Sequence, residues 1–414
     1  MGQTAIDKLS WPCVTHFSFL FNIFGAERME QRRVDYWILI SVLLLVFTGV
    51  MMVYSASAIN ANEKYHDAYY FLKREIVFAL ISIGMLFTMM KINYHKYWKM
   101  VYPFMAVTIL LCVLVAIPGI GIKAGGARRW LGLGPFTFQP SEMVKLSFIL
   151  FMAYSLAKKR DKMEKFTIGV LPHLAVAGVM MGLILVQKDL GTTFTLGVVL
   201  MILLFVGGTR LSYLAGAILF SIPALYLLVF SVDYRRQRIL AFLDPWTHIS
   251  SSGFQIIQSY VGFNVGGLWG AGLGQGKQKL FFLPAAHTDF ILSVLGEELG
   301  LFGVLTVIML FLIILVRGFR AALKAPDLFG MYLALGITSL IGVQSLINFG
   351  VVMGLLPTKG LPLPFISYGG TSLIVMSACM GMVLNIASQA GTRTDVATPP
   401  EKNYLANRSK AVPS

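Results

Sequence analysis

The stretch 36-YWILISVLLLVFTGVMMVYSAS-57 contains no charged side chain. An α-helix needs about 20 apolar residues to cross the hydrocarbon core of a bilayer, so this stretch predicts a membrane span. Apolar runs of similar length recur as far as residue 390, in a chain of 414 residues that is 57% hydrophobic and only 13% charged. This composition excludes an ordinary soluble domain and predicts an integral membrane protein.

The fold class that follows is all-α. A membrane helix satisfies its backbone hydrogen bonds internally, and the sequence lacks the alternation of period two that a transmembrane barrel requires. We therefore expect a polytopic protein with ten transmembrane helices, at about 36–57, 71–90, 101–118, 140–157, 168–187, 190–207, 211–231, 289–316, 328–355 and 365–388.

The distribution of Lys and Arg predicts the orientation. An even number of spans places both termini on one side, and the larger share of the 34 basic residues falls on that side, so the positive-inside rule makes it cytoplasmic. The basic residues of the outer side cluster in two loops, at about 119–139 and 232–288. The net charge of +15 fits contact with anionic lipid head groups. No basic domain stands clear of the membrane, which argues against nucleic acid as a partner.

The ends of the chain differ from the apolar part between them. The C-terminal residues are polar and are expected to be disordered. The N-terminal residues lack the features of a signal peptide, and Met29 is an alternative start to Met1. We divide the chain into a cytoplasmic N-terminal segment (1–33), a ten-helix membrane domain with a large outer loop between helices 7 and 8 (34–388, loop about 232–288), and a cytoplasmic tail (389–414).

The large outer loop contains two patterned segments. Apolar positions in 253-GFQIIQSYVGF-263 recur at helical spacing, which predicts a helix lying in the membrane interface. The following stretch, 262-GFNVGGLWGAGLGQG-276, is rich in glycine. This density predicts close approach to another backbone or a bent re-entrant path; the alternative is a flexible connector.

Ionisable residues at the ends of spans are the candidates for function. In 139-QPSEMVKL-146, Pro140 suits a helix start, and Glu142 and Lys145 share a helix face. They form either a self-neutralising ion pair or, with Arg129 as a second partner of the glutamate, a site with positive charge to spare.

Two further stretches place polar residues near the outer side. Asp189 of 187-QKDLGTT-193 lies between two spans, where a plain ion pair with its neighbour is the alternative to a functional role. The prolines and glycines of 356-LPTKGLPLPFISYGG-370 prevent a regular helix and orient Lys359 and Ser367 toward the outer aqueous side. This segment either lines a cavity or forms a rigid turn.

The stretch 284-PAAHTDFILSVLGEELG-300 carries three carboxylates into an apolar helix. Thr288 is a candidate N-cap that places Asp289 in the first helical turn at the water boundary, where an anion is favoured. We expect Asp289 to carry chemistry; the alternative is a simple helix cap. Glu297 and Glu298 lie deeper, and we expect them to be held by partners inside the bundle and to contribute to stability.

These motifs together resemble the SEDS family (shape, elongation, division and sporulation). The resemblance covers about residues 34–388, and the PTKG at 357–360 is more similar to the FtsW/SpoVE branch than to the RodA branch. The segments that carry it are 126-GARRWLGLG-134, 138-FQPSEMVKL-146, 187-QKDLGTT-193, 234-YRRQRILAFLDPW-246, 253–300 and 356-LPTKGLPLPFISYGGTSL-373.

The resemblance implies a peptidoglycan glycosyltransferase of cell division that polymerises lipid II on the outer face of the bacterial inner membrane. It also implies work at the division site with a class B penicillin-binding protein and other divisome membrane proteins. Asp289 matches the essential aspartate of the family. The residues placed around the substrate are Arg129, Glu142, Lys145, Asp189, His287, Thr288, Lys359 and Ser367. Lys188 and Ala285 depart from the family pattern, where proline and often glutamate stand.

The chemistry expected of such a site needs one base and several cations. Asp289 would accept the proton of the acceptor hydroxyl, and Arg129 would bind the leaving pyrophosphate in bidentate fashion, in a transfer that inverts the anomeric centre. The three scattered cysteines predict no metal site, so we expect no cofactor; the alternative is a divalent cation held loosely at the pyrophosphate. The alternatives are a lipid II flippase and a non-catalytic scaffold of the divisome.

Overall fold

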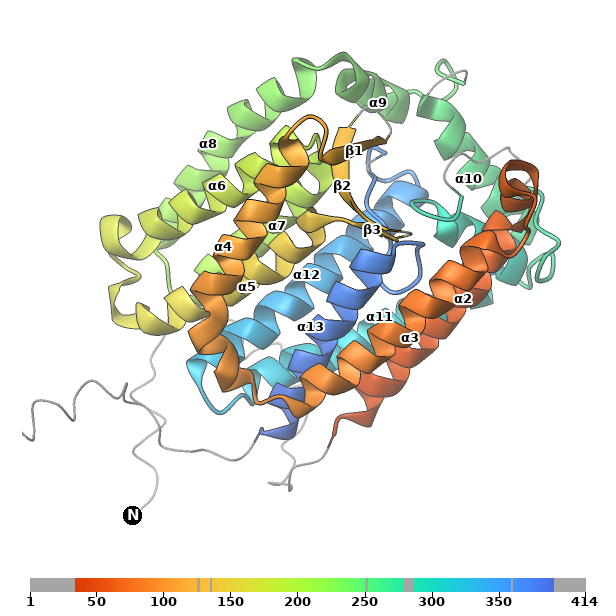
Figure 1. Ribbon diagram of the computed structural model, residues 1–414. Coiled ribbons are helices and arrows are strands. Elements are labelled where there is room, and N and C mark those ends of the chain that lie inside the picture. Colours follow the sequence, from red (N-terminus) through yellow and green to blue (C-terminus); the bar gives the residue numbers. More distant parts are fainter. Residues whose placement is uncertain are drawn as a thin grey trace, which may run out of the picture.

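The computed structural model describes residues 34–124, 127–134, 136–249, 252–278, 286–358 and 360–390. A helix lies in each of the predicted apolar runs (Figure 1). The helices of these runs are α2 (Tyr36–Tyr65), α3 (Tyr70–Lys91), α4 (Tyr97–Ala116), α5 (Pro140–Lys158), α6 (Leu171–Val186), α7 (Leu190–Val206), α8 (Leu211–Phe230), α11 (Ile291–Leu323), α12 (Leu328–Val352) and α13 (Gly370–Ser388). Short helical turns η1 (Tyr94–Lys96), η2 (Arg160–Lys162) and η3 (Phe166–Val170) extend or join them.

Length and hydropathy confirm a polytopic helical membrane protein. In the described ranges, seven helical segments are long and apolar enough to cross a membrane, and α7 is apolar but shorter. The helices α3 and α5 carry charged side chains in their first turns, which lowers their hydropathy. The count of ten spans therefore stays a prediction. The extreme segments 1–33 and 391–414, with the choice between Met1 and Met29, lie outside the described residues.

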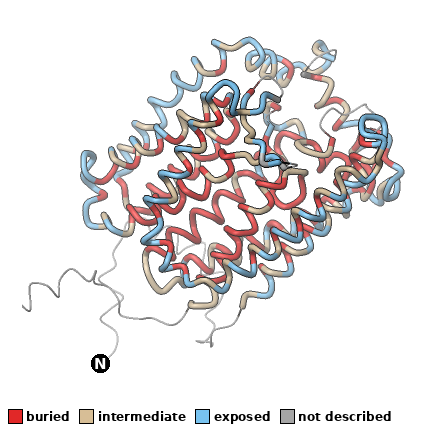
Figure 2. Tube along the Cα trace, viewed as in Figure 1, coloured by how far each residue is buried: buried red, intermediate tan, exposed pale blue. Residues whose placement is uncertain are grey.

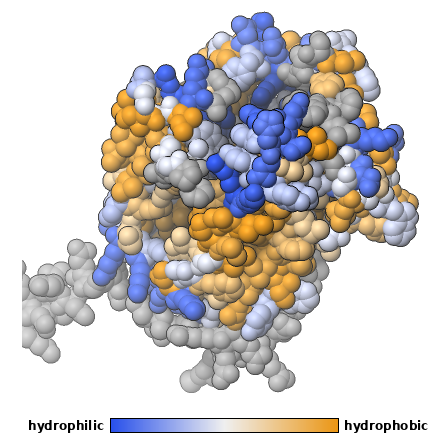
Figure 3. All heavy atoms as spheres, turned by 45° about the vertical axis from the view of Figure 1, so that its right-hand side comes forward, coloured by the Kyte–Doolittle hydropathy of each residue, from blue (hydrophilic) through white to orange (hydrophobic). Residues whose placement is uncertain are grey.

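The core of the bundle lies along α5, α12 and α13, which run through the centre of the molecule (Figures 1 and 2). The 18-residue spans of α12 and α13 are both 78% buried, whereas that of α8 at the edge is 11% buried. Hydrophobic side chains cover the middle of the face shown in Figure 3, and hydrophilic ones gather above and below it. This banding is what a bilayer requires of a membrane protein.

The loop at 119–139 contains strands, which the sequence analysis did not predict, within a fold that is otherwise all-α. It forms a three-stranded antiparallel sheet of β1 (Gly121–Ala124), β2 (Ala127–Leu133) and β3 (Phe136–Phe138), in the order β1-β2-β3. Pairing of Gly121 with Leu131 and of Leu131 with Phe138 sets the register. Strand β2 contacts α4 and α5, so the sheet lies at one end of the bundle (Figure 1). The large loop also contains α9 (Asp233–Leu243).

The large loop contains a helix, α10 (Ser252–Gly266), where the sequence predicted one, and a glycine-rich strap, residues 267–278, follows it. The position of α10 at the membrane interface stays a prediction. The strap crosses α11 where Gly300 (φ 66°, ψ −165°) breaks that helix. Ala271 N donates to Glu297 O (2.9 Å), and Leu301 N donates to Gly267 O (2.9 Å). A Cβ on Gly270 would lie 2.2 Å from a backbone oxygen of α11. The predicted close backbone approach is therefore present, and the predicted single span at 289–316 is broken at Gly300.

Candidate active site

The turn at 286–290 carries Asp289 and is fixed by hydrogen bonds to its backbone. The Asn348 amide of α12 donates to Asp289 O (3.0 Å) and to Leu361 O (2.9 Å). The Ser367 hydroxyl donates to Thr288 O (2.6 Å), and Tyr368 N donates to the carbonyl of the preceding residue, His287 (3.0 Å). Three consecutive carbonyls are thus held by the irregular segment 361–368 and by α12, which positions the turn rigidly.

The start of α11 differs from the sequence-based expectation. The helix begins at Ile291 with Phe290 as its N-cap residue and no side-chain capping bond. Thr288 is therefore not the N-cap, and Asp289 lies in the turn before the helix rather than in its first turn. The prediction failed because the backbone of this turn is held by the segment 361–368 instead of entering the helix. Asp289 is also half-buried rather than fully at the aqueous rim.

The electrostatic surroundings of Asp289 combine burial with nearby cations. Burial is the largest influence and raises the pKa of the Asp289 carboxyl to about 6, while Arg238 and then Arg129 lower it and Asp189 raises it further. Among the described residues, no side chain hydrogen-bonds or ion-pairs with this carboxylate. The group is thus held in place through its main chain and left available for chemistry.

Arg238 of α9 is a site residue that the sequence did not single out. Its guanidinium donates to Thr358 O (3.4 Å), and it is the cation with the largest influence on the pKa of Asp289. A Cβ on Gly360 would lie 3.2 Å from Asp289 Oδ2, so the same segment passes beside the carboxylate. The basic run 234-YRRQR-238 was evident from the sequence, but its position relative to Asp289 depends on the fold of a long loop and could not be predicted. Lys359 lies outside the described residues.

Arg129 and Asp189 organise the neighbouring turn. From β2, Arg129 donates to Gln187 O (3.0 Å) and Lys188 O (2.7 Å). The Asp189 carboxylate caps α7 by accepting from the Thr192 amide (3.0 Å) and hydroxyl (2.9 Å). Both oxygens of Asp189 are therefore engaged locally, whereas those of Asp289 are not.

Glu142 and Lys145 form a buried ion pair of 2.7 Å at the start of α5, with side chains 4% and 1% exposed. Lys145 Nζ also donates to Gln344 Oε1 (3.4 Å), and Gln344 donates to Pro362 O (3.3 Å). In the described ranges, no hydrogen bond joins this pair to Arg129. The structure thus links Glu142 and Lys145 to the segment 361–368, not to the turn that Arg129 holds.

His287 stands among aromatic rings. Its ring centroid lies 5.1 Å from that of Phe71 in α3 and 5.8 Å from that of Tyr368. Burial lowers the pKa of the His287 imidazole, which favours the neutral form at physiological pH. His287 therefore adds a flat, uncharged surface beside Asp289.

The deeper carboxylates of α11 have structural partners. Glu297 is fully buried and accepts from the amides of Lys277 (2.7 Å) and Gln278 (3.2 Å) of the strap. Glu298 is buried and accepts from the Ser55 hydroxyl of α2 (2.6 Å). These contacts confirm the expectation that both glutamates are held inside the bundle.

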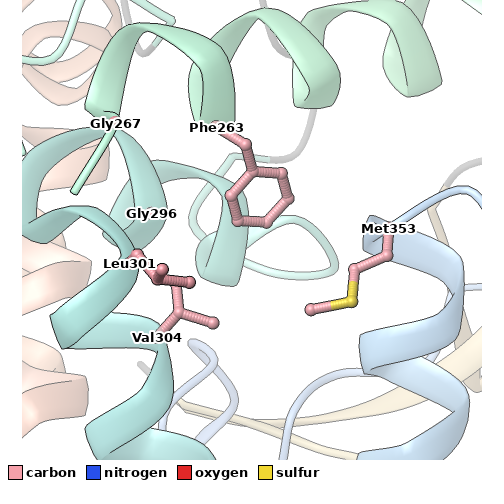
Figure 4. A pocket seen from close by; sticks show the side chains of 6 residues that line it. All are labelled: Phe263, Gly267, Gly296, Leu301, Val304 and Met353. Carbon is pink, nitrogen blue, oxygen red and sulfur yellow. The ribbon is translucent and has the colours of Figure 1, made fainter.

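A separate cavity of about 230 Å³ lies between α10, α11 and α12 (Figure 4). Phe263 extends into it from α10, and Met353 faces Leu301 and Val304 across it. No ionisable side chain lines it, so it offers no acid or base. The parts of the chain that the structure describes also contain no cluster of three or more His, Cys, Asp or Glu side chains able to hold a metal ion.

Comparison with known proteins identifies the family. Residues 36–392 match the family described as "Cell cycle protein", which groups FtsW, RodA and SpoVE. The chain belongs to the SEDS family. This SEDS protein is 49% identical over 366 residues to the "Probable peptidoglycan glycosyltransferase FtsW" of Geobacter metallireducens, which covers 88% of this chain and 98% of that one. It is 42% identical to stage V sporulation protein E of Bacillus subtilis, over 85% and 90% of the two chains.

Solved structures give the same relationship. The SEDS fold superposes with a TM-score of 0.71 and 28% identity on a chain of a peptidoglycan synthase complex that coordinates polymerization and crosslinking, over 86% of this chain and 98% of that one. The rod shape determining protein RodA of Thermus thermophilus gives a TM-score of 0.64 and 27% identity, over 86% and 97%. The higher identities to FtsW and SpoVE confirm the predicted resemblance to that branch.

Proposed function

We propose that this SEDS protein is a peptidoglycan glycosyltransferase that polymerises lipid II into glycan strands on the outer face of the cytoplasmic membrane. The enzyme class follows from relatives of that name that match most of the chain at close to 50% identity. The observation that carries the mechanism is Asp289, a half-buried carboxylate whose turn is held by its backbone and whose side chain stays available beside two arginines.

In the proposed reaction, Asp289 accepts the proton of the acceptor's 4-hydroxyl as that oxygen attacks the donor's anomeric carbon. The bond from this carbon to the pyrophosphate oxygen breaks, and undecaprenyl pyrophosphate leaves with the electron pair. With a pKa of about 6, Asp289 is ionised at neutral pH and is a stronger base than an exposed aspartate. The nearby Asp189 is engaged in capping α7, so one carboxylate acts and the anomeric centre inverts.

The leaving pyrophosphate needs cations, and the two arginines are placed differently for that role. Arg129 uses two of its donor nitrogens on the carbonyls of residues 187 and 188. Arg238 makes one long bond, of 3.4 Å, to a carbonyl and keeps the rest of its planar fork for phosphate oxygens. We therefore assign the main pyrophosphate contact to Arg238, with Arg129 holding the turn and adding charge. Lys145 and Lys359 stay candidates for further contacts.

The partners and the location complete the proposal. The SEDS-like chain of the solved peptidoglycan synthase complex acts where polymerization and crosslinking are coordinated, which supports a penicillin-binding protein as partner. For this chain we propose a class B penicillin-binding protein and other divisome membrane proteins, at the division site of the inner membrane, with both termini cytoplasmic.

The test is glycan-strand formation from purified lipid II by the protein in nanodiscs with its partner bound. We expect strands from the wild type and none above background from Asp289→Asn, in protein that elutes and melts like the wild type. A parallel assay follows lipid II movement across vesicle membranes. Movement without strand formation would contradict the proposal and favour a flippase.

A further inference from the structure

A series of aromatic rings connects the turn that holds Asp289 with the protein surface. We call it the aromatic ladder; it consists of Tyr65, Tyr70, Phe71, His287 and Tyr368. Tyr65, at the end of α2, stacks on Tyr70, at the start of α3, with ring centroids 4.0 Å apart and an angle of 11°. Phe71 lies edge-on to Tyr70 at 5.2 Å. It then contacts His287 at 5.1 Å and Tyr368 at 5.2 Å.

Two cations accompany the outer rings of the ladder. Lys64 Nζ lies 5.4 Å from the centroid of the Tyr65 ring, and the Arg74 guanidinium lies 4.5 Å from that of Tyr70. Tyr65 is 39% exposed, while Phe71, His287 and Tyr368 are half-buried. The ladder therefore runs from an exposed outer end, where two cations lie beside its rings, to an inner end two residues from the proposed base.

These features fit one class of ligand. Aromatic rings with a hydroxyl at the edge present an apolar face and a hydrogen-bonding rim, which matches the C–H face and the hydroxyl groups of a sugar. Cations beside the rings complement carboxylates, and the peptides that branch from a peptidoglycan strand carry carboxylates. We propose that the aromatic ladder binds the nascent glycan strand next to the proposed active site, and so keeps the strand attached between successive additions.

This proposal rests on the proposed glycosyltransferase function, and it differs from the ordinary role of aromatic residues at a membrane surface. Tyrosines are common at the membrane interface, where they anchor helices. A second stacked pair, Tyr54 and Tyr69 (5.6 Å, 1°), lies nearby on the same two helices. In the described part of the chain its rings contact neither His287 nor Tyr368. It therefore serves as the control for a purely interfacial role.

The experiment compares three double variants in nanodiscs with the partner present. The ladder variant is Tyr65→Leu with Tyr70→Leu, the control is Tyr54→Leu with Tyr69→Leu, and the conservative variant is Tyr65→Phe with Tyr70→Phe. Two quantities are measured: the length distribution of strands made from lipid II, and the affinity for purified, lipid-free glycan oligomers bearing stem peptides.

We expect the ladder variant to bind glycan oligomers about tenfold more weakly, as the loss of two aromatic contacts implies, and to release shorter strands. The control should match the wild type, and the conservative variant should recover most of the affinity. Unchanged binding and strand length in the ladder variant would overturn the proposal, as would an equal loss in the control.

The binding measurement separates this proposal from the proposed function. A wild type that makes no strands but binds glycan oligomers through the ladder would refute the polymerase and leave the ladder intact. Strand formation by the wild type, together with binding of glycan oligomers that does not depend on the ladder, would support the polymerase and refute the ladder.

Discussion

Asp289 and Glu297 belong to the same segment of the chain, yet the structure treats the two carboxylates in opposite ways. At Asp289 the main chain is held, through Asn348, and the side chain makes no bond to any described residue. At Glu297 the side chain itself is held, by the amides of the glycine-rich strap. A carboxylate whose own oxygens are satisfied contributes to folding, whereas one that is only positioned is kept for chemistry.

The sharpest test of this comparison makes the same chemical change at both places. Asp289→Asn should slow strand formation at least ~100-fold, the usual contribution of a positioned base, without changing thermal stability. Glu297→Gln should leave the rate per folded molecule near that of the wild type but destabilise the fold by about 1–3 kcal/mol, since buried amides lose a charged acceptor. Thermal unfolding and lipid II polymerisation of both variants test this prediction. A stable but inactive Glu297→Gln together with an unstable but active Asp289→Asn would reverse the roles that we assign to the two carboxylates.

The pH dependence of the wild type is the next largest effect. Burial raises the pKa of the Asp289 carboxyl to about 6, so the carboxyl is protonated below that pH and cannot accept a proton. The rate should be level above about pH 7 and fall roughly tenfold per pH unit below pH 6. Strand formation measured between pH 5 and pH 8 provides the check. A rate that stays level down to pH 5 would show that the base titrates lower, or that Asp289 is not the base.

Arg238 is expected to affect both the pKa of Asp289 and the departure of the pyrophosphate. Arg238→Ala removes the cation that lowers the pKa of Asp289 most, so the acid limb of the pH profile should move to higher pH. The rate at pH 7.5 should also fall about tenfold, and Arg238→Lys should restore only part of it because the planar fork is lost. Matched pH profiles of the two variants provide the measurement. An unchanged midpoint in Arg238→Ala would place this side chain away from the reacting groups.

The smallest effect is expected when Glu142 and Lys145 are replaced together. Both side chains are buried and paired with each other, so replacing Lys145 alone by Leu should leave a buried charge and reduce both stability and activity. The double change Glu142→Gln with Lys145→Met removes both charges and should cost little, since buried ion pairs are often replaceable. Polymerisation near the wild-type rate in the double variant would assign the pair to structure. Loss of activity in a stable double variant would assign Lys145 to the substrate.

The sequence predicted the helices better than the details of the site. Hydropathy located the long helices of the described residues because a membrane span requires a long apolar stretch. The turn at 286–290 was recognisable because Asp289 is a charged residue just before an apolar helix. The break at Gly300 was missed because glycine alone does not reveal a φ of 66°. Arg238 was missed because its place beside Asp289 depends on how a long loop folds. Asn348 was not named from the sequence, and Ser367, which was expected to face the outer aqueous side, is buried and donates to Thr288 O. Spacing does not encode such long-range contacts with backbone carbonyls.

The break in α11 also has a consequence for how this helix enters the membrane during synthesis. The half after Gly300 contains an uncharged, largely apolar run, 301–316, which inserts readily. The half before Gly300 contains two glutamates, whose transfer into lipid is costly. The strap is made before α11 emerges, and its amides are the partners that Glu297 needs. We therefore expect insertion of the half after Gly300 and docking of the half before it to be separable events in biogenesis.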